Sequence, residues 1–169
     1  MSDLKLSRPL LLVGCGKMGS AMLSGWLESG IAAGGVIAVE PMGMPPEFLG
    51  VAGVEVVASA DELTDDLDPE VVVFAVKPQQ MDDVTPAYRR FAGCNTAFLS
   101  IAAGKNIAYF TAQLGDGAVI VVRCRTRPQP SARESLSAAA TPRQRTHSGS
   151  WAGRFWLQQA KRLWSMTKD

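Results

Sequence analysis

The chain has 169 residues, of which 47% are hydrophobic and 20% charged, and its formal net charge is +1. This length suits one ordinary domain with a sizeable core, and no apolar run approaches the roughly 18 residues that a membrane span needs. The N-terminal segment shows no cleavable signal pattern. Cys15, Cys94 and Cys124 are widely spaced without a CxxC pair, which indicates neither a disulfide framework nor a metal site. We therefore expect a cytoplasmic protein without a metal, and neither a membrane nor a nucleic acid as its partner.

Charge and composition divide the chain after Arg123. Residues 1–123 carry 8 Lys and Arg against 14 Asp and Glu, whereas residues 124–169 carry 9 against 2. The second part contains no Val and no Ile, and three of the chain's four tryptophans lie in its last nineteen residues. An abrupt shift of this kind marks a boundary. We predict a folded domain over 1–123 and a largely irregular basic tail over 124–169, with at most one helix near residues 151–166.

Strand-like apolar runs alternate with helix-like stretches before that boundary. Runs rich in β-branched residues predict strands at 10–13, 36–39, 54–57, 71–76, 97–101 and 118–122. Apolar residues at helical spacing predict a helix from Lys17 to Gly30, and Ser59 followed by Glu62 predicts a capped helix after the third strand. Apolar strands separated by helices indicate a parallel sheet covered on both faces. The expected fold class is α/β, a Rossmann-like, doubly wound, mostly parallel sheet.

Gly14, Gly16 and Gly19 form a G-x-G-x-x-G pattern between the first strand and the first helix. In a dinucleotide-binding turn the first glycine allows the tight bend, the second lets the backbone approach a pyrophosphate, and the third lets helix and strand pack closely. The phosphates then lie at the helix N-terminus, where unpaired N–H groups favour an anion. A glycine-rich turn with no ligand is the competing interpretation, and the preceding strand and following helix count against it.

Glu40 ends the second predicted strand, at about the ~20 residues from the glycine pattern where dinucleotide folds place an acid. A carboxylate in that position accepts hydrogen bonds from the ribose hydroxyls of NAD and repels the 2′-phosphate of NADP. The sequence therefore indicates a nicotinamide dinucleotide and favours NADH over NADPH.

Three longer segments carry further information: GCGKMGSAMLSGWLESG, VVVFAVKPQQM and LSIAAGKNIAYFTAQLG. In this order, and over about residues 10–123, they resemble the N-terminal domain of pyrroline-5-carboxylate reductases. The resemblance implies an oxidoreductase of proline biosynthesis that reduces 1-pyrroline-5-carboxylate to L-proline with NADPH or NADH, the cofactor supplying the hydride. It assigns no catalytic residue. Together with the glycine pattern it implies a cofactor site made of Gly14, Cys15, Gly16, Lys17, Met18, Gly19, Glu40, Val76, Lys77, Pro78, Ser100, Ala102, Ala103 and Gly104.

Several of these residues also have simpler interpretations. Lys77 fits a solvated loop lysine, and Pro78 fits a residue that merely ends a strand. Ser100 and Gly104 fit caps of the next helix. Cys15 fits a small buried residue better than a reactive thiol, since no neighbour in the sequence argues for a lowered pKa.

Residues after Arg123 depart from the resemblance. The family reads Met-Pro-Asn-Thr-Pro-Ala there and continues into a helical domain that completes the substrate pocket and forms homo-oligomers, whereas this chain reads CRTRPQPS. The family's residues can be encoded by a DNA sequence that, when its reading frame is shifted by one base, translates into residues 124–131 of this chain. A frame slip near residues 119–123 therefore explains the missing Val and Ile and the excess of arginine. On this interpretation the chain resembles the cofactor-binding half of the enzyme and is weakly active or inactive alone.

The competing interpretation treats the tail as an evolved segment. Residues 151–168 combine Trp, Phe and Leu with Arg and Lys, as in a basic amphipathic helix at a membrane surface or a partner's groove. The stretch before them would be a disordered linker, because it lacks the apolar residues that offset ordering entropy. The protein would then be a non-catalytic, dinucleotide-binding regulatory module.

Overall fold

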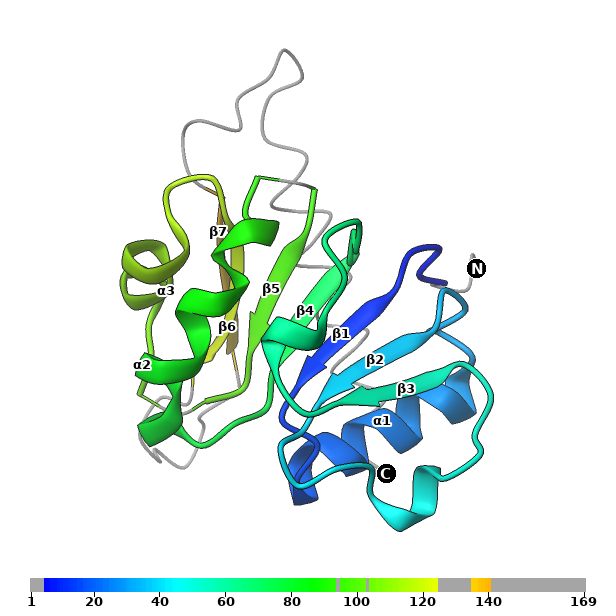
Figure 1. Ribbon diagram of the computed structural model, residues 1–169. Helices are drawn as coiled ribbons and strands as arrows, with labels where there is room; N and C mark the ends of the chain where they lie inside the picture. The colour runs from blue at the N-terminus through cyan, green and yellow to red at the C-terminus, as the bar shows by residue number, and fades with distance from the viewer. Residues whose placement is uncertain (1–4, 94, 103, 125–134, 141–169) are drawn as a thin grey trace.

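One seven-stranded sheet organises the chain, with the strand order β3-β2-β1-β4-β5-β6-β7 (Figure 1). The computed structural model describes residues 5–93, 95–102, 104–124 and 135–140, and for 123, 124 and 135–140 it describes the backbone alone. β1 to β6 run parallel and β7 runs antiparallel to β6. The strands are β1 (Leu10–Val13), β2 (Val36–Val39), β3 (Val54–Val57), β4 (Val71–Phe74), β5 (Ala97–Ser100), β6 (Val119–Cys124) and β7 (Ser135–Ala140). The chain crosses over between β3 and β4, so the predicted doubly wound, Rossmann-like sheet is confirmed.

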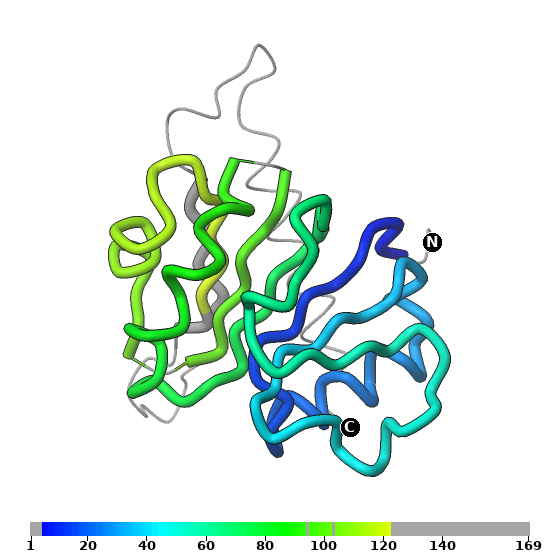
Figure 2. Tube along the Cα trace, in the orientation of Figure 1, coloured from blue at the N-terminus to red at the C-terminus, as the bar shows by residue number. Residues whose placement is uncertain are grey.

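Helices cover both faces of the sheet. In the views of Figures 1 and 2, α1 (Lys17–Ser29) lies on the far side of the sheet from α2 (Met81–Val84) and α3 (Ile107–Leu114). Short 3₁₀ turns complete the connections: η1 (Pro46–Phe48), η2 (Ala60–Glu62), η3 (Pro78–Gln80) and η4 (Thr85–Phe91). Within the described part of the chain, no helix is both long and apolar enough to cross a membrane.

The two hydrophobic clusters follow the alternation of side chains along β1. Leu10 and Leu12 belong to the cluster that contains Trp26 of α1, whereas Leu11 and Val13 belong to the cluster on the other face. Successive side chains of a strand point to opposite faces, and all four of these β1 residues are buried. β1 is therefore covered on both sides, which is why its sequence is an unbroken apolar run.

The first helix is confirmed at both predicted ends. Gly16 is its N-terminal cap, and Gly30 ends it in the left-handed conformation at φ 66°. The Gly30 N–H donates to the carbonyl oxygen of Leu27, 3.2 Å away. A residue with a Cβ is strained at this φ, so glycine suits the position.

The predicted helix after β3 is wrong. Ser59 precedes only the 3₁₀ turn η2 and makes no side-chain cap, and the Glu62 carboxylate instead accepts the Ala58 N–H at 3.2 Å. Leu63, the next residue, is extended and buried. Leu63 and Leu67 pack against the hydrophobic cluster from this turn and the residues after it, so the apolar side chains of the stretch are buried without an α-helix.

The predicted irregular tail is wrong for residues 135–140. These residues form β7, which pairs with β6 from Val119↔Ala140 to Cys124↔Ser135. Backbone hydrogen bonding satisfies the edge of β6 and does not require the Val and Ile on which the composition argument depended. The rest of the tail, including the proposed helix at 151–166, lies outside the described residues, and the boundary after residue 123 stays a prediction.

We predict that Gly19→Ala destabilises the domain. A Cβ at residue 19 would overlap the carbonyl oxygen of Gly14, which is backbone and cannot rotate away. Overpacking of this kind costs about 1–3 kcal/mol of unfolding free energy, to be measured by urea denaturation.

Gly16→Ala is the matched control on the same helix. Residue 16 has φ −71°, and a Cβ there meets no atom within 4 Å, so we expect only the loss from the poorer N-cap residue, below about 1 kcal/mol. Equal losses in the two variants would contradict the close approach of α1 to β1.

Candidate functional site

A cavity of about 440 Å³ lies at the carboxyl ends of β1 to β4. Gly14 follows β1, residues 40–42 follow β2, residues 58–60 follow β3 and Val76 follows β4, and all of them line it. Its volume falls in the range of about 300–1,000 Å³ that small-molecule sites occupy. The strand order reverses between β1 and β4, and open α/β sheets bind ligands at such a switch point.

The glycine pattern forms a tight turn at one wall of this cavity. Gly14 has φ 89°, and its N–H donates to the Val39 carbonyl oxygen at 2.9 Å. A Cβ on Gly14 would lie 2.7 Å from Cγ1 of Val76, and one on Gly19 would overlap the Gly14 carbonyl oxygen. Gly16 differs from both, because it is exposed and has open space around it. The middle glycine therefore leaves room for a ligand, whereas the other two serve packing.

The N-terminus of α1 begins beside this open space. Ser20 donates the first helical hydrogen bond, to the Gly16 carbonyl oxygen at 2.8 Å. The N–H groups of the first turn have no partner within the helix and carry partial positive charge. Lys17 and Met18 are exposed there. Such an N-terminus next to a glycine turn provides the donors that a phosphate group needs.

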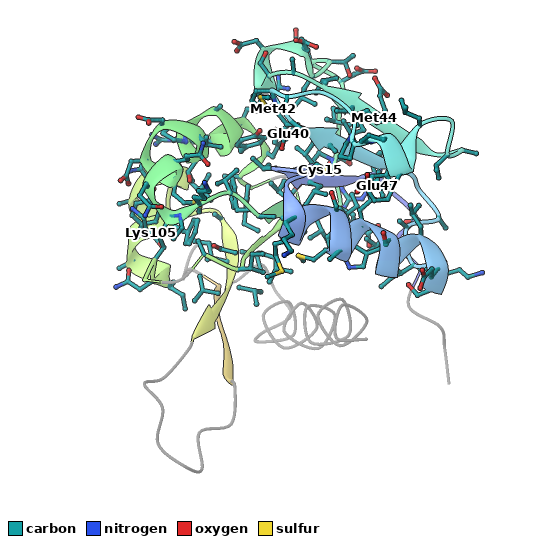
Figure 3. All side chains as sticks on the ribbon, turned by 90° about the horizontal axis from the view of Figure 1, so that it is seen from below. Cys15, Glu40, Met42, Met44, Glu47 and Lys105 are labelled. Carbon is teal, nitrogen blue, oxygen red and sulfur yellow. The ribbon has the colours of Figure 1, made fainter. Side chains whose placement is uncertain are left out.

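Glu40 connects the glycine turn to the loop after β2. Its Oε2 accepts the Cys15 N–H at 2.8 Å, and its Oε1 accepts the Met42 N–H at 3.2 Å. Figure 3 shows Glu40 beside Met42 and close to Cys15, well away from Lys105. Two backbone donors therefore fix the carboxylate at the wall of the cavity.

The charged residues that line the cavity are all acidic. Glu40 and Asp83 contribute carboxylates, and no Lys or Arg occurs among the described residues of the lining. Tyr88, also in the lining, is buried, and this burial raises the pKa of its phenol, opposed by the charge of Arg90. The phenol is therefore neutral at physiological pH.

Cys15 is a packing residue in this turn. It is buried, and burial raises the pKa of its thiol; a hydrogen bond with Ser20 lowers it, and the charge of Glu40 raises it further. A thiol that stays protonated is a poor nucleophile. In the part of the chain that the structure describes, no group of three or more His, Cys, Asp or Glu side chains could hold a metal ion.

The loops after β4 and β5 leave the same edge of the sheet, since Phe74 pairs with Ser100. Lys77 is exposed and Pro78 begins η3. Ser100 is buried, and its hydroxyl accepts the Ala102 N–H at 3.2 Å. Its side chain therefore shapes the loop, as its simpler interpretation expects.

An ion pair joins the loop after β5 to α2. Nζ of Lys105 lies 2.9 and 3.1 Å from the two carboxylate oxygens of Asp82 and 4.0 Å from the centre of the Tyr109 ring. The hydrogen bond from Lys105 lowers the pKa of Asp82, and the pKa of Lys105 is raised in turn. Because Asp82 is exposed, we expect the pair to orient this loop more than to stabilise the fold.

The structure brings together one part of the predicted site. Gly14, Glu40 and Val76 line the cavity, and Cys15 to Gly19 continue from Gly14 into α1. Lys77, Pro78, Ser100, Ala102 and Gly104 are not among the residues that line it, and Ala103 lies outside the described residues.

Sequence reasoning missed several lining residues. Met42 and Ser59 line the cavity and follow strands β2 and β3, which the sequence predicted. Because open α/β sheets bind ligands at the carboxyl ends of their strands, this position alone could have identified both residues. Asp83 and Tyr88 gave no such signal, because their place depends on how α2 and η4 pack on the sheet.

Comparison with known proteins places the fold among dehydrogenases and reductases. A pyrroline-5-carboxylate reductase of Mycobacterium tuberculosis is 29% identical over 141 residues, which are 78% of this chain and 44% of that protein. The structure of a pyrroline-5-carboxylate reductase from Coxiella burnetii aligns with a TM-score of 0.66 at 17% identity, covering 94% of this chain and 57% of that one. The structure of a prephenate dehydrogenase from A. aeolicus, in complex with hydroxyphenyl propionate and NAD+, aligns with a TM-score of 0.65 at 15% identity. This alignment covers 98% of this chain and 59% of that one.

The chain thus spans about half the length of the relatives that it matches. The two structural likenesses, at such low identity, show the fold alone. A family model described as "NADP oxidoreductase coenzyme F420-dependent" matches residues 10–104, a stretch that contains β1 to β5 and the whole glycine turn. Since this match covers more than half of the chain, the protein belongs to that oxidoreductase family.

Proposed function

We propose that this chain is the dinucleotide-binding half of a pyrroline-5-carboxylate reductase, an NAD(P)H-dependent enzyme of proline biosynthesis. The observation that carries the proposal is the open space at Gly16, beside the N-terminus of α1 and the cavity at Gly14. In this proposal the N–H groups of the first turn hold the pyrophosphate, and Glu40 lies at the adenosine ribose. The residues fit such a group, since the middle glycine leaves the backbone accessible where the phosphates must approach.

The loops after β4 and β5 are proposed to lie at the nicotinamide end. Val76, Lys77 and Pro78 follow β4, and Ser100, Ala102, Ala103 and Gly104 follow β5. The ion pair between Lys105 and Asp82 connects the loop after β5 to α2, the helix that follows the loop after β4. When bound, the reduced nicotinamide supplies the hydride for reduction of a C=N bond.

The proposed substrate is inferred from the relatives of this chain. A pyrroline-5-carboxylate reductase of M. tuberculosis resembles this chain in sequence, and the KPQ and SIAAG segments belong to the part that resembles this enzyme class. The prephenate dehydrogenase shares the fold at lower identity, and a shared fold does not determine the reaction. A cytoplasmic location and 1-pyrroline-5-carboxylate as the substrate stay predictions.

We predict that Gly16→Val weakens binding of NADH and NADPH by at least about tenfold. The valine side chain would occupy the open space that a pyrophosphate needs, without striking any atom of the chain within 4 Å of its Cβ. Isothermal titration calorimetry measures the affinity, and urea denaturation checks that the fold is retained.

Ala21→Val serves as the control. Ala21 is an exposed residue of the same helix, so this variant has the same β-branched side chain away from the glycine turn. It should bind both dinucleotides as the unaltered chain does. Unchanged affinity in folded Gly16→Val would overturn the placement of the pyrophosphate.

We also predict that the 169-residue chain alone reduces 1-pyrroline-5-carboxylate at least about 10²-fold less efficiently than a version with the reading frame restored after Arg123. The resemblance implies that a helical domain after residue 123 completes the substrate pocket, and residues 124–169 of this chain do not resemble that domain. A poorly oriented imine carbon reacts slowly even where the hydride donor is bound.

The measurement compares kcat/KM of the two proteins with NADH and with NADPH, with the M. tuberculosis reductase as the positive control. Comparable turnover by the two versions would show that residues 1–123 with the present tail suffice for the reaction.

A further inference from the structure

We propose that Lys105 is a positioning residue: by pairing with Asp82 it holds the loop after β5 against α2, at the end of the site where the nicotinamide half of the dinucleotide binds. The inference rests on the proposed function, since it assumes that a dinucleotide binds with its nicotinamide at the loops after β4 and β5. It concerns two residues that are not among the site residues implied by the resemblance to the reductases.

The loop after β5 is fixed at both of its ends. Near its start the Ile101 N–H donates to the Phe74 carbonyl oxygen at 3.3 Å, and at its end the side chain of Asn106 caps α3. Between these points Gly104 is exposed and has φ 83°. Lys105, the next residue, connects this stretch to another element. The position of the stretch therefore depends on the contact that Lys105 makes.

Lys105 makes this contact with its charged end. Its Nζ lies 2.9 and 3.1 Å from the two carboxylate oxygens of Asp82, and 4.0 Å from the centre of the Tyr109 ring. The side chain of Lys105 is 18% exposed, whereas that of Asp82 is 61% exposed. The ammonium group thus contacts a carboxylate and an aromatic ring at once, and both attract a cation.

α2 connects this contact to the cavity. Asp83 and Val84 line the cavity, whereas Asp82 is not among the lining residues and accepts hydrogen bonds from Lys105. Successive residues of a helix point about 100° apart, so one short helix presents Asp83 to the cavity and its neighbour to the loop after β5. Figure 3 shows Lys105 well away from Glu40. Lys105 can therefore act on the nicotinamide end without touching the adenosine end.

The nicotinamide end is where such positioning has an effect. A loop that is ordered before the ligand arrives loses less conformational freedom on binding. A loop released from α2 would have to be ordered by the nicotinamide itself, so the affinity for this half of the ligand would fall. ADP-ribose lacks the nicotinamide ring, and its affinity should not depend on the ion pair.

A purely structural role for the ion pair is the alternative explanation. Its loss would then disturb the packing of α2, which also lines the cavity, and would weaken NADH and ADP-ribose binding to the same extent. Positioning of the loop instead changes the ratio of the two affinities.

The experiment measures binding to the full chain by calorimetric titration with NADH and with ADP-ribose. The unaltered chain should bind NADH more tightly than ADP-ribose. Lys105→Met removes the charge and keeps a long side chain, and Asp82→Asn removes the charge of the partner. Each should weaken NADH binding about three- to fivefold, as expected for an exposed ion pair, and change ADP-ribose binding by less than about twofold.

Three further variants test the pairing itself. Lys105→Arg keeps the charge and should keep the NADH affinity. The double variant Lys105→Met with Asp82→Asn should bind NADH no more weakly than the weaker single variant, because the two residues act through one contact. Asp65→Asn is the matched control: it makes the same change in another exposed ion pair, Arg90 with Asp65 at 3.3 Å, and should leave both affinities as they are.

The outcomes separate the two proposals. Failure of the unaltered chain to bind either ligand would overturn the proposed function itself. The positioning role alone would be overturned if the unaltered chain bound both ligands equally, if the NADH-to-ADP-ribose affinity ratio stayed the same in Lys105→Met and Asp82→Asn, or if Asp65→Asn lowered it as much. Urea denaturation checks each variant, and loss of the fold would assign the pair to stability and overturn the positioning role as well.

Discussion

The contact between Gly19 and the Gly14 carbonyl oxygen is the constraint on which the site depends. Because residue 19 has no Cβ, α1 can begin directly against the end of β1, and buried Trp26 anchors the helix further along. The helix N-terminus then starts beside the cavity, with the exposed backbone of Gly16 at the approach. Close packing at Gly19 and open space at Gly16 are thus two consequences of one turn, and the second would be lost without the first.

Glu40 combines two roles that are often assigned to different residues. Its hydrogen bonds connect the turn after β1 with the loop after β2, so it helps to shape the cavity that it lines. The same bonds direct its charge toward any ligand in that cavity. A substitution at residue 40 therefore changes geometry and electrostatics together, and only ligands that differ by a single phosphate can separate the two effects.

The sequence predicted β1, β2 and β3 to the residue, because each is a short run of mostly aliphatic residues that begins after a glycine or proline, although only β1 of the three is buried throughout. It placed the ends of later strands one or two residues away, and it failed for the helix after Ser59 and for β7. Both failures involve tertiary context: Leu63 and Leu67 reach the hydrophobic cluster from a 3₁₀ turn and an extended segment, and residues 135–140 pair with the open edge of β6. The site divides similarly, since Gly14 and Glu40 have local signatures whereas Asp83 reaches the cavity only through the packing of α2.

The family description names NADP, whereas the loop after β2 places the carboxylate of Glu40 in the cavity lining, and the two observations concern different parts of the molecule. The glycine turn and the strands β1 to β5 lie in the stretch that matches the family model, and in the proposed function the turn holds the pyrophosphate that both dinucleotides share, so this stretch does not distinguish the cofactors. In the proposed function the 2′-position of the ribose lies near residues 40–42, where Glu40 accepts the backbone N–H groups of Cys15 and Met42 and the Met42 side chain is exposed. That loop can change its charge while the sheet stays the same, and cofactor preference can therefore differ between proteins of one fold.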